Sequence, residues 1–67
     1  MRIFSQRLKE LRLEKGLSIK ALGDIIGVKD MAVSRWENDK TDILSKNLIR
    51  LAQFFGVTTD YLLGLED

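Results

Sequence analysis

The sequence predicts an all-α fold of five short helices, and three observations lead to this prediction. Apolar residues recur at intervals of three and four along the chain, which is the period of an amphipathic helix. Four of the five glycines fall where this pattern stops, and proline is absent. A chain of 67 residues holds one small core, so we expect a single domain over residues 1–67.

The first helix is predicted to run from Ser5 to Lys15. Ser5 is a favourable N-cap residue, and Gly16 can adopt the left-handed conformation that ends a helix. The apolar positions of this helix are Leu8, Leu11 and Leu13. Ser18 is the expected N-cap of a second helix that ends at Gly27. The apolar stripe of the second helix consists of Leu22, Ile25 and Ile26.

A third helix is predicted from Lys29 to Asn38. It has only a narrow apolar seam, formed by Val33 and Trp36, so we expect Trp36 in the core and the other faces exposed. Phe54 and Phe55 are expected in the core or in an interface.

A polar loop leads to a fourth helix, for which Ser45 is the expected N-cap and Gly56 the expected end. The apolar positions of the fourth helix are Leu48, Leu51, Ala52 and Phe55. Thr58 is expected to cap a fifth helix, where Val57 and Leu62 are spaced to form a hydrophobic staple.

Composition excludes several classes of protein. The chain has no cysteine and no histidine, so we expect neither a disulfide nor a zinc site, and no cofactor. It has no nucleophile with a base partner, no glycine-rich phosphate loop and too little length to enclose a pocket, so we expect no enzyme. Its apolar runs are too short for a membrane span, which predicts a cytoplasmic protein. The net charge of +1 does not by itself indicate nucleic-acid binding.

The segment over residues 18–38 carries the most specific pattern. Two helices joined by about three residues must cross steeply, which requires a small residue where their backbones approach and a glycine in the turn. Gly23 and Gly27 meet these requirements. A helix of this kind can lie in the roughly 12 Å wide major groove of DNA and present its outer side chains to base edges. The outer side chains of the third helix are Asp30, Met31, Ser34 and Arg35.

Two runs of residues resemble a known family. They are Gly-Val-x-x-x-Ala-Val-Ser-x-Trp-Glu-Asn over 27–38 and Gly-Val-x-x-Asp-Tyr-Leu-Leu over 56–63. Both are similar to lambda-repressor/Cro-type helix-turn-helix regulators, particularly the N-terminal DNA-binding domains of lambdoid phage repressors. The resemblance implies a transcriptional repressor or regulator of phage or prophage type. Such a protein binds a pseudo-palindromic DNA operator as a homodimer, which we expect to be weak in free solution.

The resemblance also implies roles for individual residues. Base contacts are implied for Asp30, Met31, Ser34 and Arg35. Phosphate contacts are implied for Ser18, Lys29, Asn38, Lys40, Thr41, Ser45 and Lys46. A symmetric dimer contact is implied for Val57, Thr59, Tyr61 and Leu65. Structural roles fall to Arg12 paired with Glu37, and to Gly23, Gly27 and Trp36.

The chain departs from the family pattern at two positions. Ile19 stands where the family often has a polar residue, commonly glutamine, that braces a phosphate, and Lys29 replaces the usual serine or threonine cap of the recognition helix. Asp30 can either accept from a base or serve as a partner for the helix dipole. With Asp39 and Asp42 it opposes phosphate, which predicts weak non-specific affinity.

Two less specific interpretations remain. The basic residues that no motif singles out are expected to be solvated: Arg2, Arg7, Lys9, Lys15 and Arg50. The near-neutral charge also allows a protein-interaction module on the same scaffold, such as an antitoxin, an antirepressor or a polymerase-contacting factor. In a regulator, Asp24 on the second helix is a candidate contact for RNA polymerase.

Overall fold

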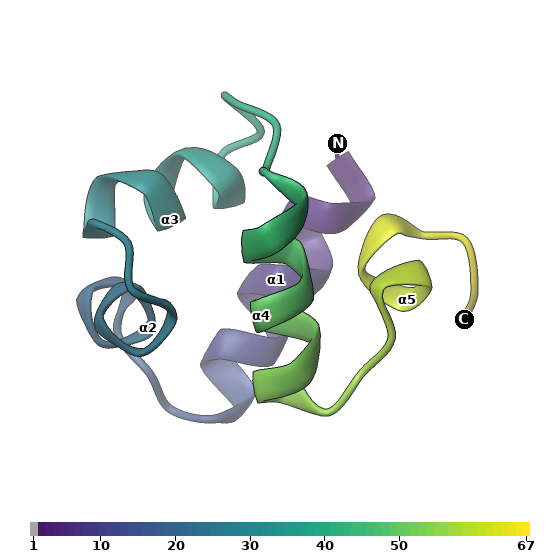
Figure 1. Cartoon of the computed structure of the whole chain (residues 1–67), viewed down its shortest axis with the longest axis horizontal. Coiled ribbons are helices and arrows are strands. Elements are labelled where there is room, and N and C mark those ends of the chain that lie inside the picture. Colours follow the sequence, from purple (N-terminus) through teal and green to yellow (C-terminus); the bar gives the residue numbers. More distant parts are fainter. Residues whose placement is uncertain (1) are drawn as a thin grey trace.

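The computed structural model describes residues 2–67, and all regular structure in this range is helical (Figure 1). The helices are α1 (Arg2–Glu14), α2 (Ile19–Ile26), α3 (Asp30–Glu37), α4 (Ser45–Phe55) and α5 (Thr59–Leu63). The prediction of an all-α fold with five short helices is therefore confirmed. Within the described residues, no helix has the length and apolar character needed to cross a membrane.

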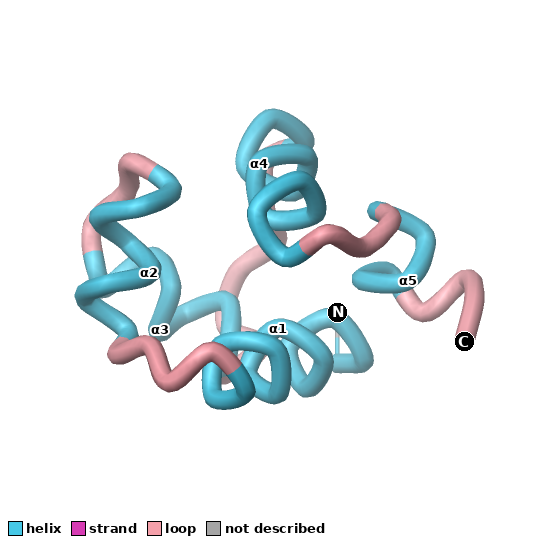
Figure 2. The backbone as a smooth tube through the Cα atoms, turned by 90° about the horizontal axis from the view of Figure 1, so that it is seen from below, coloured by secondary structure: helices cyan, strands magenta, loops and turns pink. Residues whose placement is uncertain are grey.

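Helices α1 and α4 form the middle of the molecule, and the other helices lie on either side of them, as Figure 1 and Figure 2 show. On one side α2 packs against α3 and α4, while α3 also packs against α1. On the other side α5 packs against α1 and α4, and the C-terminus lies beside it. The α2–α3 pair and α5 are therefore at opposite ends of the longest dimension, which measures 28 Å.

Every helix contributes one side chain with no exposed surface to a common core. These side chains are Leu8, Leu22, Val33, Leu51 and Leu62. Trp36 is 4% exposed and joins them from α3, as the seam with Val33 predicts. Phe54 and Phe55 lie edge to face with their ring centroids 5.0 Å apart, and both pack against the core while partly exposed. Because the same core holds all five helices, substitutions in it should disturb the orientation of each helix.

Several helix ends form as the sequence predicts. Ser18 Oγ accepts from the amide of Ala21 at 3.0 Å, and Thr58 Oγ1 accepts from the amide of Tyr61 at 2.9 Å. Each bond satisfies an amide that has no partner within its helix. α4 ends at Gly56 with φ +69°, in the left-handed conformation that glycine adopts without strain.

The predicted caps at Ser5 and Ser45 are wrong. α1 already begins at Arg2, because Phe4 and Leu8 lie one turn apart and the chain must be helical at both to bury them. Ser5 is consequently a buried residue inside α1, and its hydroxyl donates to the carbonyl of Trp36. At α4 the capping position is Leu44, whose side chain cannot accept a hydrogen bond.

Leu13 and Ile25 were expected in apolar stripes, and both are exposed. Leu13 is 57% exposed because the buried face of α1 passes through Phe4, Leu8 and Arg12, and Leu13 lies about 100° further around the helix than Arg12. Ile25 is 48% exposed because Leu22 and Ile26 already fill the inner face of α2. The sequence pattern identified these helices correctly but overestimated the width of their buried faces.

Candidate nucleic-acid interface

The turn between α2 and α3 brings the two helices into close contact at Gly23. The carbonyl oxygen of Gly23 accepts from the amides of Gly27 at 2.8 Å and Val28 at 2.9 Å. A Cβ at position 23 would lie 2.9 Å from the carbonyl oxygen of Val28, closer than real Cβ contacts. Gly27 adopts φ +87°, so the chain reverses there and α3 starts at Asp30. The crossing of the two helices therefore depends on glycine at both positions.

The inner face of α3 is held firmly. Val33 is fully buried and Trp36 nearly so, and the carbonyl of Trp36 accepts the hydroxyl proton of Ser5 in α1. The outer face is accessible, because Met31 is 60% exposed, Asp30 and Arg35 are exposed, and Ser34 is partly exposed. The structure thus brings the four predicted base-contacting side chains onto one rigidly mounted helix.

A buried ion pair fixes the end of α3 to α1. Arg12 Nε lies 2.6 Å from Glu37 Oε2, and Arg12 Nη2 lies 3.0 Å from Glu37 Oε1. Arg12 Nη1 also donates to the carbonyl of Leu17 at 2.8 Å, so one guanidinium joins three segments of the chain. The side chains are only 9% and 4% exposed. The hydrogen bond to Glu37 raises the pKa of Arg12, whose charge therefore persists at every pH used for binding studies.

The start of α3 differs from a standard capped helix. Lys29 occupies the N-cap position and makes no side-chain capping bond. Instead Asp30 Oδ1 accepts from the amide of Met31 at 2.8 Å, within the first turn. A carboxylate at this position also stabilises the positive end of the helix dipole. One oxygen of Asp30 is therefore already used within the helix, as the dipole interpretation of this residue expects.

The candidate phosphate contacts come before and after α3 in the sequence. Ser18, at the start of α2, is exposed, and so are Lys29, Lys40, Thr41, Ser45 and Lys46. Asn38 is also exposed, but its Nδ2 donates to the carbonyl of Ser34 at 2.8 Å. Asn38 therefore caps the C-terminal end of α3. Only the hydrogen-bonding capacity of its side chain that this cap does not use remains for a ligand.

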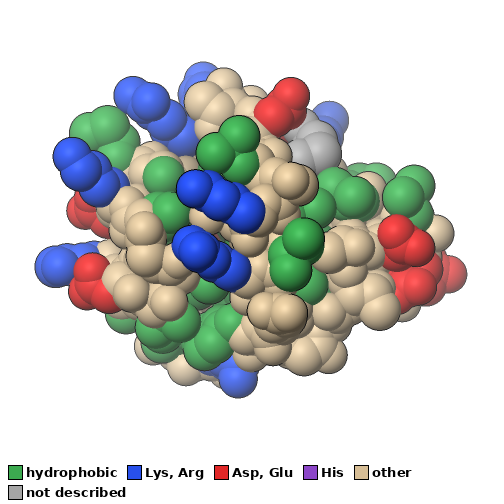
Figure 3. All heavy atoms as spheres, viewed as in Figure 1, with side chains coloured by type: hydrophobic (Ala, Val, Ile, Leu, Met, Phe, Trp, Pro, Cys, Tyr) green, Lys and Arg blue, Asp and Glu red, His purple; other side chains and the backbone are tan. Residues whose placement is uncertain are grey.

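Charge is distributed unevenly over the molecule. Lys and Arg side chains gather over α2, α3 and α4 in Figure 3, interspersed with acidic ones. After Arg50 the chain contains no basic residue, and its charged residues are Asp60, Glu66 and Asp67. The segment around α5 is therefore acidic in sequence, and Arg7 of α1, which packs against it, offsets part of this charge. This end should attract a polyanion such as DNA less than the end with α2 and α3 does.

The candidate dimer residues surround α5. Leu65 is 72% exposed, whereas Val57, Thr59 and Tyr61 are partly buried. Arg7 lies over the ring of Tyr61, 4.3 Å from its centroid, and its Nη1 donates to the carbonyls of Tyr61 and Glu66. The expectation that Arg7 is simply solvated is therefore wrong. No local pattern could reveal this contact, because it joins residues 54 positions apart in the sequence.

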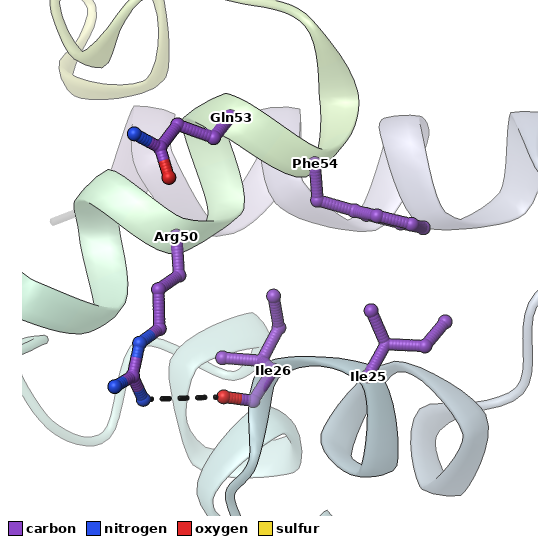
Figure 4. Close-up of a pocket in the computed structure, with 5 residues that line it drawn as sticks. All are labelled: Ile25, Ile26, Arg50, Gln53 and Phe54. Carbon is purple, nitrogen blue, oxygen red and sulfur yellow. Dashed lines mark hydrogen bonds between the residues drawn. The ribbon is translucent and has the colours of Figure 1, made fainter.

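Two further basic residues also have partners. Arg50 Nη1 donates to the carbonyl of Ile26 at 3.4 Å and so links α4 to the end of α2, as Figure 4 shows. Lys15 Nζ lies 5.2 Å from the ring centroid of Phe54, within reach of a cation–π interaction. Both residues are exposed, as predicted for solvated charge, and each also makes one contact with a neighbouring helix.

The folded α2–α3 pair, with a buried inner face and an accessible outer face, defines a helix-turn-helix protein. The chain belongs to the helix-turn-helix family, which it matches over residues 8–62. This family is a class of regulators and not of enzymes.

Its relatives include regulators of phage and prophage origin. It is 34% identical over 61 residues to the SPbeta prophage-derived uncharacterized HTH-type transcriptional regulator YonR of Bacillus subtilis, covering 91% of this chain and 56% of YonR. It is 31% identical to Repressor protein C2 of Salmonella phage P22, covering 91% of this chain and 28% of the repressor. The chain therefore spans about half or less of the length of these relatives.

Solved structures agree with this assignment. The P22 c2 repressor in complex with a synthetic operator superposes with a TM-score of 0.86 at 29% identity, covering 92% of this chain and 94% of that one. The restriction-modification controller protein C.AhdI of Aeromonas hydrophila superposes with a TM-score of 0.82 at 31% identity, covering 91% and 92% of the two chains. The fold is thus shared with the P22 c2 repressor and with a restriction-modification controller.

Proposed function

We propose that this chain is the DNA-binding part of a transcriptional repressor or regulator of phage or prophage type, acting in the cytoplasm on a pseudo-palindromic operator. The observation that carries the proposal is α3, whose inner face is fixed by Trp36 and the Arg12–Glu37 pair while its outer face is accessible. A helix held in this way can enter the major groove without rearrangement. Similarity to a repressor solved with its operator supports the same conclusion.

Base recognition falls to four side chains of different chemistry. Arg35 can donate two bonds to O6 and N7 of guanine, and the second oxygen of Asp30 can accept from N4 of cytosine. Met31 can lie against thymine methyl groups, while the hydroxyl of Ser34 can serve several bases. Each good bidentate contact contributes about 1–3 kcal/mol of discrimination between bases. Specificity on this scheme depends on few contacts.

Contacts to the phosphate backbone are proposed to contribute only modestly to DNA affinity. Amides at the start of α2 beside Ser18 can bind one phosphate, and Lys46 near the start of α4 can bind another. Lys29, Asn38, Lys40, Thr41 and Ser45 extend this set at its edges. Because Asp39 and Asp42 are exposed in the intervening loop, they oppose part of this attraction. The salt dependence of binding should therefore be shallow for a DNA-binding protein.

A homodimer completes the proposal. Val57, Thr59, Tyr61 and Leu65 would form the contact around the two-fold axis, at the acidic end of the molecule. Two subunits so joined would read half-sites about 34 Å apart, one turn of DNA. Since these side chains form only a small apolar surface, we expect weak pairing in free solution and stronger pairing on the operator.

Selection from randomised double-stranded DNA tests this function directly. We expect enrichment of a two-fold symmetric motif, and binding of that motif that weakens as salt is raised. If no motif is enriched and affinity is independent of salt, the chain is not a sequence-specific DNA-binding domain.

One observation favours a protein-interaction module as the second candidate. Ile25 and Phe54 face each other across an open pocket of about 510 Å³ between α2 and α4 (Figure 4). Asp24, next to Ile25 on α2, is exposed and could contact RNA polymerase. Absence of DNA binding together with binding of a partner protein that Ile25→Asp abolishes would favour this function. Normal activation by an Asp24→Asn variant would exclude the polymerase contact.

A further inference from the structure

A second open pocket, of about 370 Å³, lies on the outer side of the helix-turn-helix. It is lined by Ile19 from the first turn of α2 and by Asp30, Met31 and Ser34 from α3. Three of these four residues belong to the proposed base-contacting set. The fourth, Ile19, contributes an apolar side chain from α2 to this lining.

The lining combines two apolar and two polar side chains. Ile19 is partly buried against the core, so its position is fixed, whereas Met31 is 60% exposed and has a flexible side chain that can adapt to a ligand. Asp30 adds a carboxylate to the lining. Ser34 Oγ accepts from Asn38 Nδ2 at 3.4 Å, which leaves its hydroxyl proton for an outside acceptor.

This combination restricts what the pocket can receive in the major groove. Ile19 has no group that can bind a phosphate, and the carboxylate of Asp30 repels one. Among the groups that bases present in this groove, the methyl at C5 of thymine is the apolar one. 5-Methylcytosine carries the same methyl beside an amino group that Asp30 can bind, whereas thymine carries it beside an oxygen that Ser34 can bind.

We propose that this pocket receives the 5-methyl group of a pyrimidine, and that Ile19 is a specificity-determining residue. This inference rests on the proposed DNA-binding function and adds to it a residue and a chemical group. Ile19 and Met31 enclose the methyl from two helices, so the contact is positioned by the same tight turn that positions α3. Burial of one methyl group corresponds to about a fourfold gain in affinity.

Replacement of single thymines by deoxyuridine in the selected operator tests the inference, because only the methyl is removed. We expect one position in each half-site at which this change weakens binding of the unmodified protein by about fourfold. The Ile19→Ala variant should bind the two operators with nearly equal affinity. Ile25→Ala is the matched control, since Ile25 is an exposed isoleucine of the same helix outside this pocket, and it should retain the full difference.

The test compares the affinities of one protein for two operators. A general loss of stability lowers both affinities and leaves their ratio unchanged. If Ile19→Ala does not fold, Met31→Ala at an exposed position carries the same test and should also reduce the ratio. Operators with cytosine or 5-methylcytosine at the sensitive position distinguish the two sources of the methyl. A gain on methylation of cytosine assigns the site to both bases, and no gain restricts it to thymine.

The outcomes separate this inference from the proposed function. A symmetric operator bound with high specificity, but insensitive to deoxyuridine at every thymine and to methylation of every cytosine, would overturn the pocket and leave DNA binding intact. Retention of the full methyl effect by Ile19→Ala would remove Ile19 from the site. Failure to select any operator would overturn both.

Discussion

Arg12 in α1 and Glu37 at the end of α3 form a paired, two-bond contact, with Nε to Oε2 at 2.6 Å and Nη2 to Oε1 at 3.0 Å. The pair is almost fully removed from solvent, and the third arm of the guanidinium reaches the carbonyl of Leu17. The planar, forked geometry of arginine allows it to hold both segments at once, which lysine cannot do. The contact therefore sets the angle of the proposed recognition helix relative to α1.

Removal of Arg12 should be strongly destabilising. Arg12→Ala leaves the Glu37 carboxylate buried without its partner, which typically costs about 3–5 kcal/mol of unfolding free energy. Denaturant titration followed by circular dichroism measures the effect. Lys20→Ala is the matched control, because its ion pair with Asp24 is exposed at 76% and 69%, and it should cost less than about 1 kcal/mol. Equal losses for the two variants would contradict a special role for the buried pair.

The titration of Arg12 should not limit stability in the neutral range. Glu37 raises the pKa of Arg12 in the folded state, so the stabilisation is fully present below the unfolded pKa of arginine. It is lost only as the pH rises through the folded pKa, in strongly alkaline solution. Any loss of stability between pH 6 and pH 9 would therefore have another origin.

Gly23→Ala should disrupt the turn between α2 and α3. The added Cβ would lie 2.9 Å from the backbone oxygen of Val28, which cannot move aside without shifting the start of α3. We expect a loss of about 1–3 kcal/mol in stability and a larger relative loss in operator affinity. Thermal unfolding and DNA titration measure the two effects.

Gly16→Ala provides the comparison for this variant. A Cβ at position 16 meets no atom within 4 Å, so only the strain of φ +67° remains, about 1 kcal/mol. Operator affinity measured well below the melting temperature should then be unchanged. A Gly16→Ala variant that loses operator affinity as severely as Gly23→Ala would argue against the close approach as the cause.

Arg35→Ala and Lys46→Ala should separate base contacts from phosphate contacts. Loss of Arg35 should relax preference at one base pair of each half-site and cost about 1–3 kcal/mol on the preferred operator. Loss of Lys46 should weaken all sequences alike and reduce the salt slope by about one per subunit. Competition between operator and scrambled DNA at several salt concentrations distinguishes the patterns. Equal weakening on every sequence by Arg35→Ala would assign that residue to the backbone instead.

The sequence was sufficient to predict the helices and the packing of α3, because these depend on local periodicity and on glycine positions. Trp36 and Val33 form the expected seam, and Ser18 and Thr58 make the expected caps. The caps predicted at Ser5 and Ser45 are wrong because a serine caps a helix only from the position just before the helix begins. Packing of Phe4 places the start of α1 before Ser5. Ser45 is itself the first residue of α4, so Leu44 occupies the capping position.

Local patterns did not reveal contacts over long sequence distances, and the Arg12–Glu37 pair was predicted only through the family resemblance. Arg7 and Arg50 each donate to a backbone carbonyl of a distant helix, and neither position differs in sequence from an ordinary solvated arginine. The sequence analysis singled out Ile19 but did not predict the pocket that it lines. That pocket also involves Met31, and the two residues come together only because α2 and α3 cross.

Leu65→Asp should weaken operator binding without weakening the fold. Leu65 is 72% exposed, so a charge there meets solvent in the isolated subunit, but in the proposed dimer it would place two carboxylates near the two-fold axis. We expect about a tenfold or greater loss of affinity for the full operator, little change on a single half-site, and an unchanged melting temperature.

Leu13→Asp is the control for this variant. It introduces the same charge at a 57% exposed position in α1, and it should change none of these three measurements. A tight dimer at nanomolar concentration in sedimentation experiments would contradict the expectation of weak pairing. Equal losses of Leu65→Asp on full and half operators would show that the defect lies outside the dimer contact.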